Sequence, residues 1–439
     1  MLTKIERPHR WDLKGTREGW HAFAKLAGTG NPLVIFSFCT ALVPPLLALL
    51  REDSFGVYLV GSTSTGKSAL SSCAGSVWGG DPRSVLGFGL GWRATVNALE
   101  VRALSACDGL LILDDTQLIR GNKTQRAETL RDALFGLAGG TETARLNAPQ
   151  EPRNWHTVIW STGNDSVAKI LADGRIDYDE SSAVRMLEVP ANRAHGVFDH
   201  IPQRFTAARF AEGIKRAANV NFGWASDSFL SRLILLLTRD PATLVGNLQT
   251  VGNEMRRSLD VDERDGVLAR DATKAGVIFA AGVLGSQSGA LPFSRAEVQE
   301  AIIDVMQSHW AFTREATREA DHVARVRDII AEHRAQFVDL GDPNLVMSEA
   351  LLQRAPGFIV RSKARSEYCF LPDKFEQLFR DRSGAIEPAI TALKQQGLLV
   401  HDQGNAAASQ KNQTKRRLPL PPPHDRVRVY CIDGRILDR

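Results

Sequence analysis

A glycine-bounded segment near residue 61 constrains the fold of this chain more than any other feature. Its residues are Gly61-Ser62-Thr63-Ser64-Thr65-Gly66-Lys67-Ser68, which match the pattern G-x-x-x-x-G-K-[ST]. An apolar run typical of a strand, 56–60, precedes the segment, and a stretch with helical character begins at Ala69. Strand, loop and helix in this order are the context in which such a pattern forms a phosphate-binding loop.

The chemistry of phosphate binding explains the residue types in this loop. Gly61 and Gly66 let the backbone curl, so that the N–H groups of residues 62–69 can point at a phosphate, aided by the positive end of the following helix. Lys67 would reach the β- and γ-phosphates, and the Ser68 hydroxyl would bind Mg²⁺. We therefore predict that residues 61–69 bind ATP with Mg²⁺. The alternative is an ordinary glycine turn.

Two acidic residues follow a second apolar run. Residues 110–113 are four aliphatics, and Asp114 and Asp115 come directly after them. A buried parallel strand would deliver both carboxylates to the edge of the sheet where ligands bind. We expect Asp114 to hold Mg²⁺, directly or through water, and Asp115 to polarise the attacking water. A turn after a strand is the alternative. Asp115 is one methylene shorter than the usual Glu, which bears on the hydrolysis rate more than on the fold.

The composition is that of a globular protein with room for two or three domains. The chain has 439 residues, of which 43% are hydrophobic and 24% charged. Its formal net charge is only +4, so a nucleic-acid surface would have to be a local patch. The five cysteines are scattered and include no C-x-x-C pair, so neither a disulfide framework nor a zinc ribbon is indicated. The cytoplasm is the expected compartment.

An uncharged stretch at residues 33–50 is long enough to suggest a membrane helix. Pro44 and Pro45 interrupt it, and the strand before the phosphate loop begins a few residues later. We therefore expect a buried helix packed on the sheet, kinked or broken at the prolines, and no contact with a membrane.

Short aliphatic runs alternate with helical segments from residue 55 to about 190, which predicts a parallel α/β sheet. Strands are expected near 55–60, 109–113, 156–161 and 184–189, with a further strand considered near 84–88, and helices near 68–77, 94–106 and 123–138. Residues 200–318 are helical in pattern and suit a lid over the nucleotide, with helices expected at 229–237, 268–284 and 295–310.

The C-terminal region has a different pattern. A charged amphipathic helix at 320–340 is expected to link to a third unit, in which a helix at 387–396 precedes paired strands at 398–400 and 426–430. Between these strands lies a polar, proline-rich stretch with four basic residues: Lys411, Lys415, Arg416 and Arg417. This layout is typical of a winged helix, whose wing contacts phosphates. A solvated loop in a protein-binding domain is the alternative.

Two further segments suit phosphoryl transfer. The predicted strand at 156–161 ends in polar groups, and Asn164 or Thr162 could sense the γ-phosphate and orient the lytic water by hydrogen bonding. Arg185 begins the next strand, where ring ATPases carry an arginine finger. Its delocalised charge suits the spread charge of the reaction, although a surface arginine is the simpler alternative.

The order of these segments resembles the family catalogued as domain of unknown function 927. The resemblance runs from about Gly15 to Trp310 and rests on the phosphate loop, the acid pair and four further segments: 92–100, 161–163, 184–187 and 272–282. It implies an ATPase core of the AAA+ P-loop type, similar to minichromosome-maintenance helicases, followed by a winged helix. It also implies a hexameric ring that translocates on single-stranded or forked DNA, as in self-loading replicative helicases of mobile genetic elements.

The chain departs from the family pattern in two ways. The family often has G-x-G-K-x-R in the hairpin before the sensor strand, whereas residues 140–145 here keep the arginine and lose the lysine that would grip DNA. The other departure is Asp115 in place of Glu. The chain also begins partway through the family's usual length, so an N-terminal region that recruits DNA is expected to be absent.

We therefore expect an ATP-driven DNA helicase of a mobile element, with Lys67, Ser68, Asp114 and Asp115 in the cis site. Arg185, together with Arg270 in the lid, would act across the subunit interface, although Arg270 fits a solvated helix face equally well. The expected domains are an N-terminal helical segment packed on the ATPase, the ATPase core, the lid, a linker helix and a winged-helix-like domain: 1–54, 55–195, 196–318, 319–343 and 344–439.

Two other functions stay open at this point. One is an ATP-switch regulator that binds DNA through its winged helix without translocating, which the shortened acid and the missing hairpin lysine favour. The other is a small-molecule kinase, which is disfavoured because Arg185 and the helical lid would have no role in it.

Overall fold

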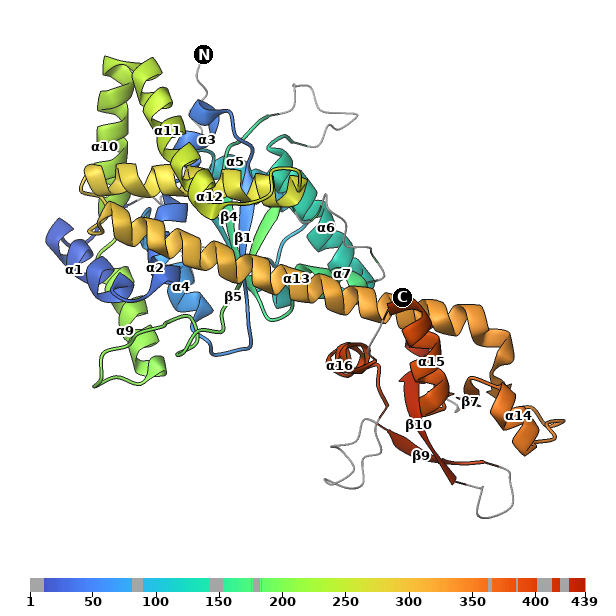
Figure 1. Cartoon of the computed structure of the whole chain (residues 1–439). Coiled ribbons are helices and arrows are strands. Elements are labelled where there is room, and N and C mark those ends of the chain that lie inside the picture. Colours follow the sequence, from blue (N-terminus) through green and yellow to red (C-terminus); the bar gives the residue numbers. More distant parts are fainter. Residues whose placement is uncertain are drawn as a thin grey trace. The chain divides into compact units, whose positions relative to one another are not determined.

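The computed structural model of this chain divides into two compact units, Met1–Thr313 and Arg314–Arg439. They are called the N-terminal unit and the C-terminal unit below, and each is described by itself (Figure 1). The structure describes ten stretches of the chain: 12–80, 90–142, 153–174, 176, 182, 184–361, 365–383, 386–400, 413–418 and 426–438.

Five parallel strands form the centre of the N-terminal unit, in the order β2-β3-β4-β1-β5. They are β1 (Phe55–Val60), β2 (Leu90–Gly91), β3 (Leu110–Asp114), β4 (Val158–Gly163) and β5 (Met186–Pro190). β4 pairs with both β1 and β3, so it lies between the strand of the phosphate loop and the strand of the acid pair. The four strands predicted at 55–60, 109–113, 156–161 and 184–189 are confirmed within two residues, while the further strand considered at 84–88 lies outside the described residues.

Helices cover both faces of this sheet (Figure 1). Val57 and Leu59 of β1 face a core that includes α2 (Pro32–Ala41), α4 (Lys67–Ser76) and α12 (Gly266–Gln287). The alternate residues Tyr58 and Val60 face a second core, made with α5 (Val96–Ser105), α6 (Lys123–Gly139) and α7 (Val167–Asp173). Burial on both faces is the reason these strands consist of continuous apolar runs.

The proline-interrupted stretch is broken as predicted. α2 ends at Ala41, α3 (Pro44–Leu50) begins after the break, and the two helices are bent by 61°. Nearly all of α2 is buried in the first core, which also contains α1 (Arg17–Gly28). No single helix within the described residues has both the length and the apolar character to cross a membrane. Among these residues, only α2 and α3 counted together, as a bent pair, have that length and apolar character.

The helical part of the N-terminal unit follows β5. It consists of α9 (Ala207–Val220), α10 (Trp224–Arg239), α11 (Pro241–Leu259), α12 and the start of α13 (Arg295–His333). The helices predicted at 229–237, 268–284 and 295–310 are confirmed. The separate linker helix predicted at 320–340 is wrong, because α13 runs without interruption from residue 295 to 333. No proline or glycine stands in that interval to end the helix.

The C-terminal unit contains a second five-stranded sheet, in the order β6-β7-β8-β10-β9. All neighbouring strands are antiparallel except β6 and β7. The elements are β6 (Val338–Asp339), α14 (Glu349–Arg354), β7 (Gly357–Arg361), β8 (Ser366–Phe370), α15 (Pro372–Ser383), α16 (Glu387–Gln395), β9 (Thr414–Arg417) and β10 (Arg426–Asp433).

Two predictions for this unit need correction. Lys415, Arg416 and Arg417 do not lie in a loop but form the edge strand β9, because they pair in register with β10. Residues 398–400 pair with β10 as an isolated bridge, Leu399 to Ile432, which lies beyond the predicted partner residues 426–430. Lys411, the fourth basic residue of the predicted loop, lies outside the described residues.

A disulfide also contradicts the expectation from the cysteine pattern. Cys369 of β8 and Cys431 of β10 are direct partners in the ladder and are bonded to each other. They are 62 residues apart in the sequence, and only the strand register brings them together.

Candidate active site

The phosphate-loop segment adopts a tightly curved backbone at the end of β1. Gly66 has φ 97° and directly precedes α4, and Ser64 also lies in the left-handed region at φ 67°. The loop is held from outside, because Val197 N–H donates to the Thr65 carbonyl at 2.9 Å. A side chain at Gly196 would approach that same carbonyl to 2.1 Å, so only glycine allows this close contact.

Lys67 is the first residue of α4, and its side chain contacts the start of the loop. Its ammonium donates to the carbonyls of Gly61 and Ser62, the latter at 2.7 Å, and to Asn164 Oδ1 at 3.2 Å. Burial lowers the pKa of Lys67, while the nearby carboxylates of Asp115 and Asp114 act in the opposite direction. Lys67 therefore links the loop to Asn164, which directly follows β4.

The acid pair is fixed by Thr162 at the end of β4. Thr162 Oγ1 donates to Asp114 Oδ1 at 2.7 Å and accepts from the Asp115 backbone N–H at 3.0 Å. Asp115 has φ 60°, an unusual backbone angle for a residue with a side chain, which costs on the order of 1–3 kcal/mol. Its carboxylate accepts from Gln117 N–H at 3.1 Å. Thr162, predicted as an alternative sensor, thus contacts the acids.

Tyr58 of β1 connects the segments that follow the acid pair and Asn164. Its hydroxyl lies 2.9 Å from Thr116 Oγ1 and donates to the Asp165 carbonyl at 2.9 Å, so it joins the segment after Asp115 to the segment after Asn164. A Cβ at Gly163 would lie 1.8 Å from that hydroxyl, so glycine is required there. Burial raises the pKa of Tyr58, which keeps it a neutral hydrogen-bond donor.

These groups surround one cavity of about 410 Å³, a size within the usual range for small-molecule sites. Its walls come from the phosphate loop, the ends of β3 and β4, and helix α9. The lining residues are Thr63, Ser64, Thr65, Gly66, Lys67, Ser68, Ala69, Asp114, Asp115, Gln117, Thr162, Asn164, Ala208, Ala211, Glu212 and Lys215. All the residues predicted for the cis site are therefore brought together. Gly61 and Ser62, at the start of the loop, accept hydrogen bonds from Lys67.

Four polar residues of this site were not predicted from the sequence: Tyr58, Gln117, Glu212 and Lys215. Glu212 and Lys215 lie on α9 and form an ion pair with each other. α9 is a strongly amphipathic helix with one apolar stripe, and nothing in that pattern distinguishes a helix beside a nucleotide from any other surface helix.

Arg185 and Arg270 lie in another cavity, of about 510 Å³. Residues 52–55, at the start of β1, line it as well, whereas the phosphate loop follows the end of β1. The two cavities are therefore at opposite ends of the parallel strands. The Arg185 guanidinium carbon lies 4.0 Å from the ring centroid of Phe135. Among the described residues, neither arginine lines the phosphate-loop cavity.

A buried charged network braces this second cavity. Asp271 pairs with Lys274 at 3.0 Å and with His309 Nε2 at 3.0 Å, and the Trp310 indole also donates to it. His309 Nδ1 lies 2.8 Å from the Glu188 carbonyl of β5. The network ties α12, which carries Arg270, to the strand that begins after Arg185.

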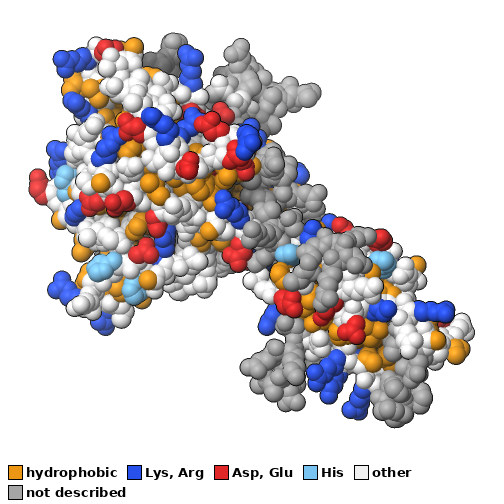
Figure 2. Space-filling view, in the orientation of Figure 1, with side chains coloured by type: hydrophobic (Ala, Val, Ile, Leu, Met, Phe, Trp, Pro, Cys, Tyr) orange, Lys and Arg blue, Asp and Glu red, His pale blue; other side chains and the backbone are white. Residues whose placement is uncertain are grey.

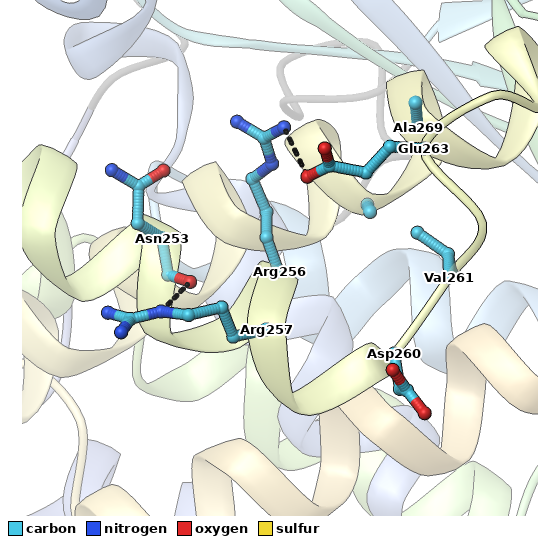
Figure 3. Close-up of a pocket in the computed structure, with 8 residues that line it drawn as sticks. Asn253, Arg256, Arg257, Asp260, Val261, Glu263 and Ala269 are labelled. Carbon is cyan, nitrogen blue, oxygen red and sulfur yellow. Dashed lines mark hydrogen bonds and ion pairs between the residues drawn. The ribbon is translucent and has the colours of Figure 1, made fainter.

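A third cavity, about 540 Å³, lies between the end of α11 and the start of α12 (Figure 3). Its two arginines have intramolecular partners, since Arg256 pairs with Glu263 at 3.9 Å and Arg257 donates to the Asn253 carbonyl at 3.2 Å. Although this cavity is the larger one, it contains no curved backbone and no acid pair at a strand end. Its size alone does not make it the nucleotide site.

Comparison with known proteins supports part of the sequence interpretation. The model of the family described as domain of unknown function (DUF927) matches residues 4–148, which include the phosphate loop and the acid pair. This confirms the predicted resemblance, although the match ends before three of the segments on which it rested: 161–163, 184–187 and 272–282. No curated protein matches the chain.

A solved structure titled "SCCmec type IV Cch - active helicase" is similar to the whole chain. The similarity covers 98% of this chain and 73% of that one, with a TM-score of 0.54 and 18% sequence identity. At this level of identity the likeness concerns the fold.

Proposed function

We propose that this chain is an ATP-dependent DNA helicase of the AAA+ type, a replicative helicase of a mobile genetic element; the match of residues 4–148 to the DUF927 model accords with the resemblance from which this proposal starts. The observation that carries the proposal is the convergence of residues 61–69, Asp114, Asp115 and Asn164 on one cavity at the end of the parallel strands. The strand order supports it, because β4 lies between the strands of the phosphate loop and the acid pair. The similarity to a structure titled as an active helicase points in the same direction.

The residues present suit MgATP. Gly66 at positive φ gives the loop the curvature from which backbone N–H groups can converge on a phosphate. Ser68 and Asp114 offer the oxygen ligands that Mg²⁺ prefers, and the ion would neutralise charge on the β- and γ-phosphates. Thr162 holds the Asp114 carboxylate in place through its 2.7 Å hydrogen bond.

Hydrolysis then needs an oriented water and a charge that follows the reaction. Asp115 would polarise the water, and Asn164 would orient it while its amide oxygen stays within reach of Lys67. Lys67 would stabilise the charge that develops on the phosphoryl oxygens. With only the shorter Asp side chain available, Asp115 would reach the water less directly than Glu does.

Arg185 and Arg270 would act on the ATP of a neighbouring subunit. Their cavity lies at the opposite end of the parallel strands from the phosphate loop, so within one chain they cannot reach its nucleotide. We propose that the subunits form a ring, expected to be a hexamer, in which this end of the strands meets the phosphate-loop cavity of the next subunit. The C-terminal unit would serve as a winged-helix-like domain that contacts DNA.

The second candidate is an ATP-switch DNA-binding regulator that does not translocate, and Asp115 in place of Glu favours it. One set of measurements separates the two: ATPase activity with and without single-stranded DNA, unwinding of forked DNA, and the mass of the assembly. A helicase should form an oligomer, hydrolyse ATP faster with DNA and separate the fork. Slow hydrolysis that DNA does not change, without unwinding, would support the regulator.

A further inference from the structure

The β9–β10 hairpin of the C-terminal unit places like charges directly opposite one another. Lys415 pairs in register with Arg428, and Arg417 pairs with Arg426. Directly opposite residues of an antiparallel pair project from the same face, so these four exposed side chains form one surface, called the cationic face below. Like charges in this position repel and destabilise a hairpin. An anion bound across the two strands would remove that cost.

The same face of β10 changes character along its length. Tyr430 and Ile432 continue the alternation of Arg426 and Arg428, and both are buried in a core with α13, α15 and α16. Where the hairpin extends beyond this core, the face carries basic residues instead of apolar ones. Figure 2 shows Lys and Arg side chains gathered at the β9–β10 end of the unit.

Arg416 belongs to the other face of the hairpin. It pairs with Val427 in register, and its guanidinium donates to Glu367 Oε2 at 2.6 Å. Glu367 is buried, so this ion pair holds β9 to the body of the unit. Three consecutive basic residues of β9 therefore divide into two that face outward and one that is structural.

We propose that the cationic face binds the phosphate backbone of DNA without reading its sequence. Alternate residues of a strand are about 6.8 Å apart, so the two cations on each strand form a regularly spaced pair of charges. All four side chains of the cationic face are charged, which suits contact with phosphates. The choice of DNA as the polyanion rests on the proposed helicase function.

The test compares two full-length variants with equal loss of charge. In the first, Lys415, Arg417, Arg426 and Arg428 are changed to Gln. In the control, four exposed cations elsewhere are changed to Gln: Arg232, Arg239, Arg354 and Lys394. The probe is a labelled oligothymidine of about 20 nucleotides, longer than a typical binding site of this kind. Fluorescence anisotropy is measured without ATP over a salt series.

Each phosphate contact to single-stranded DNA contributes about 0.7 to the slope of log K against log salt. Loss of the cationic face should therefore reduce the slope by about 3 and weaken binding at low salt on the order of 100-fold. The control variant should bind like the wild type. A third variant, Arg416→Gln, should lower the melting temperature and leave the slope unchanged.

Several results would overturn the proposal. They are wild-type affinity in the first variant, an equal loss in the control, or binding of the wild type to phosphatidylserine vesicles but not to the oligonucleotide. Because the measurement contains no ATP, it stands even if the chain is not an ATPase. Conversely, DNA-free ATPase activity should be the same in the first variant and the wild type, since the altered residues are outside the phosphate-loop cavity.

Discussion

The two cavities of the N-terminal unit that contain the predicted site residues are built from different kinds of interaction. Around the phosphate-loop cavity, hydrogen bonds from the hydroxyls of Tyr58 and Thr162 hold the segments that carry the acids and the predicted sensor. Beside the second cavity, a buried carboxylate, Asp271, is paired with Lys274 and His309. Loss of one hydroxyl hydrogen bond costs less than the removal of one partner from a buried ion pair. We therefore expect changes at the first cavity to affect catalysis, and changes to the bracing of the second to affect stability.

The largest expected effect is that of Lys67→Ala. Removing one stabilising charge from such a site lowers kcat on the order of 10³-fold, and weaker ATP binding should lower kcat/KM further. Steady-state ATPase kinetics measure the effect, and Lys123→Ala, at an exposed ion-paired lysine of the same unit, is the control. Normal turnover in a folded Lys67→Ala protein would remove the phosphate-loop cavity as the catalytic site.

Arg185→Ala tests whether the second cavity completes the first in a neighbouring subunit. The variant should bind ATP normally but hydrolyse it about 10³-fold more slowly, because an arginine finger stabilises the spread charge of the transferred phosphoryl group. The control is Arg131→Ala, at an exposed arginine on α6.

Mixing the two inactive variants gives the decisive result. In a ring that contains both Lys67→Ala and Arg185→Ala subunits, some interfaces pair an intact phosphate loop with an intact Arg185, so part of the activity should return. If mixed oligomers verified by mass show no recovery, Arg185 does not act in trans. The two cavities would then be functionally unrelated.

Much of the first cavity could be predicted from the sequence because its parts are local. The phosphate loop and the acid pair directly follow apolar runs, Asn164 follows the polar end of the next strand, and the ends of parallel strands meet on one side of a sheet. The residues contributed by α9 could not be predicted, because their place depends on how a helix more than a hundred residues later packs against the loop. The position of Arg185 directly before β5 was correctly predicted. That this places Arg185 at the opposite end of the strands from the phosphate loop could be seen only in the folded sheet.

The C-terminal unit was harder to predict for a physical reason. The prolines and polar residues near 415–417 favoured a loop in the sequence. Residues 414–417 nevertheless form a strand, because β10 supplies ladder hydrogen bonds to them. Cys369 and Cys431 are far apart in the chain, and their pairing follows from register, which no spacing pattern contains. Non-local pairing of this kind decides both the disulfide and the cationic face.

Asp271→Asn probes the bracing of the second cavity. The change leaves Lys274 buried without its charged partner, which should cost about 3 kcal/mol of unfolding free energy at neutral pH. Chemical denaturation measures this, with Asp132→Asn on the exposed face of α6 as the control. An unchanged free energy of unfolding would mean that the charged network does not stabilise the unit.

The effect should depend on pH in a defined direction. Burial alone would raise the pKa of Asp271, but Lys274 and His309 together hold it below its ordinary value of 3.8. A carboxyl with a lowered pKa in the folded state stabilises the protein above its ordinary pKa, and this contribution is lost as the pH falls through the folded-state value. The stability difference between the wild type and Asp271→Asn should therefore narrow below about pH 4. A difference that grows in acid would contradict this assignment.

Tyr58→Phe should have the smallest effect and gives the finest test of the comparison. The change keeps the ring and removes only the hydroxyl that joins Thr116 to the Asp165 carbonyl, two hydrogen bonds worth about 1 kcal/mol each. If Tyr58 positions Asp115 and Asn164, kcat should fall about 10-fold while the KM for ATP stays nearly the same, because misplaced catalytic groups affect the transition state more than binding. Tyr368→Phe, at a similarly buried tyrosine of the C-terminal unit, controls for the loss of a buried hydroxyl. A fall in melting temperature with unchanged kcat in Tyr58→Phe would show that this hydroxyl only stabilises the fold. The Tyr58 hydrogen bonds beside the first cavity would then only stabilise the unit, as is expected of the Asp271 ion pairs beside the second.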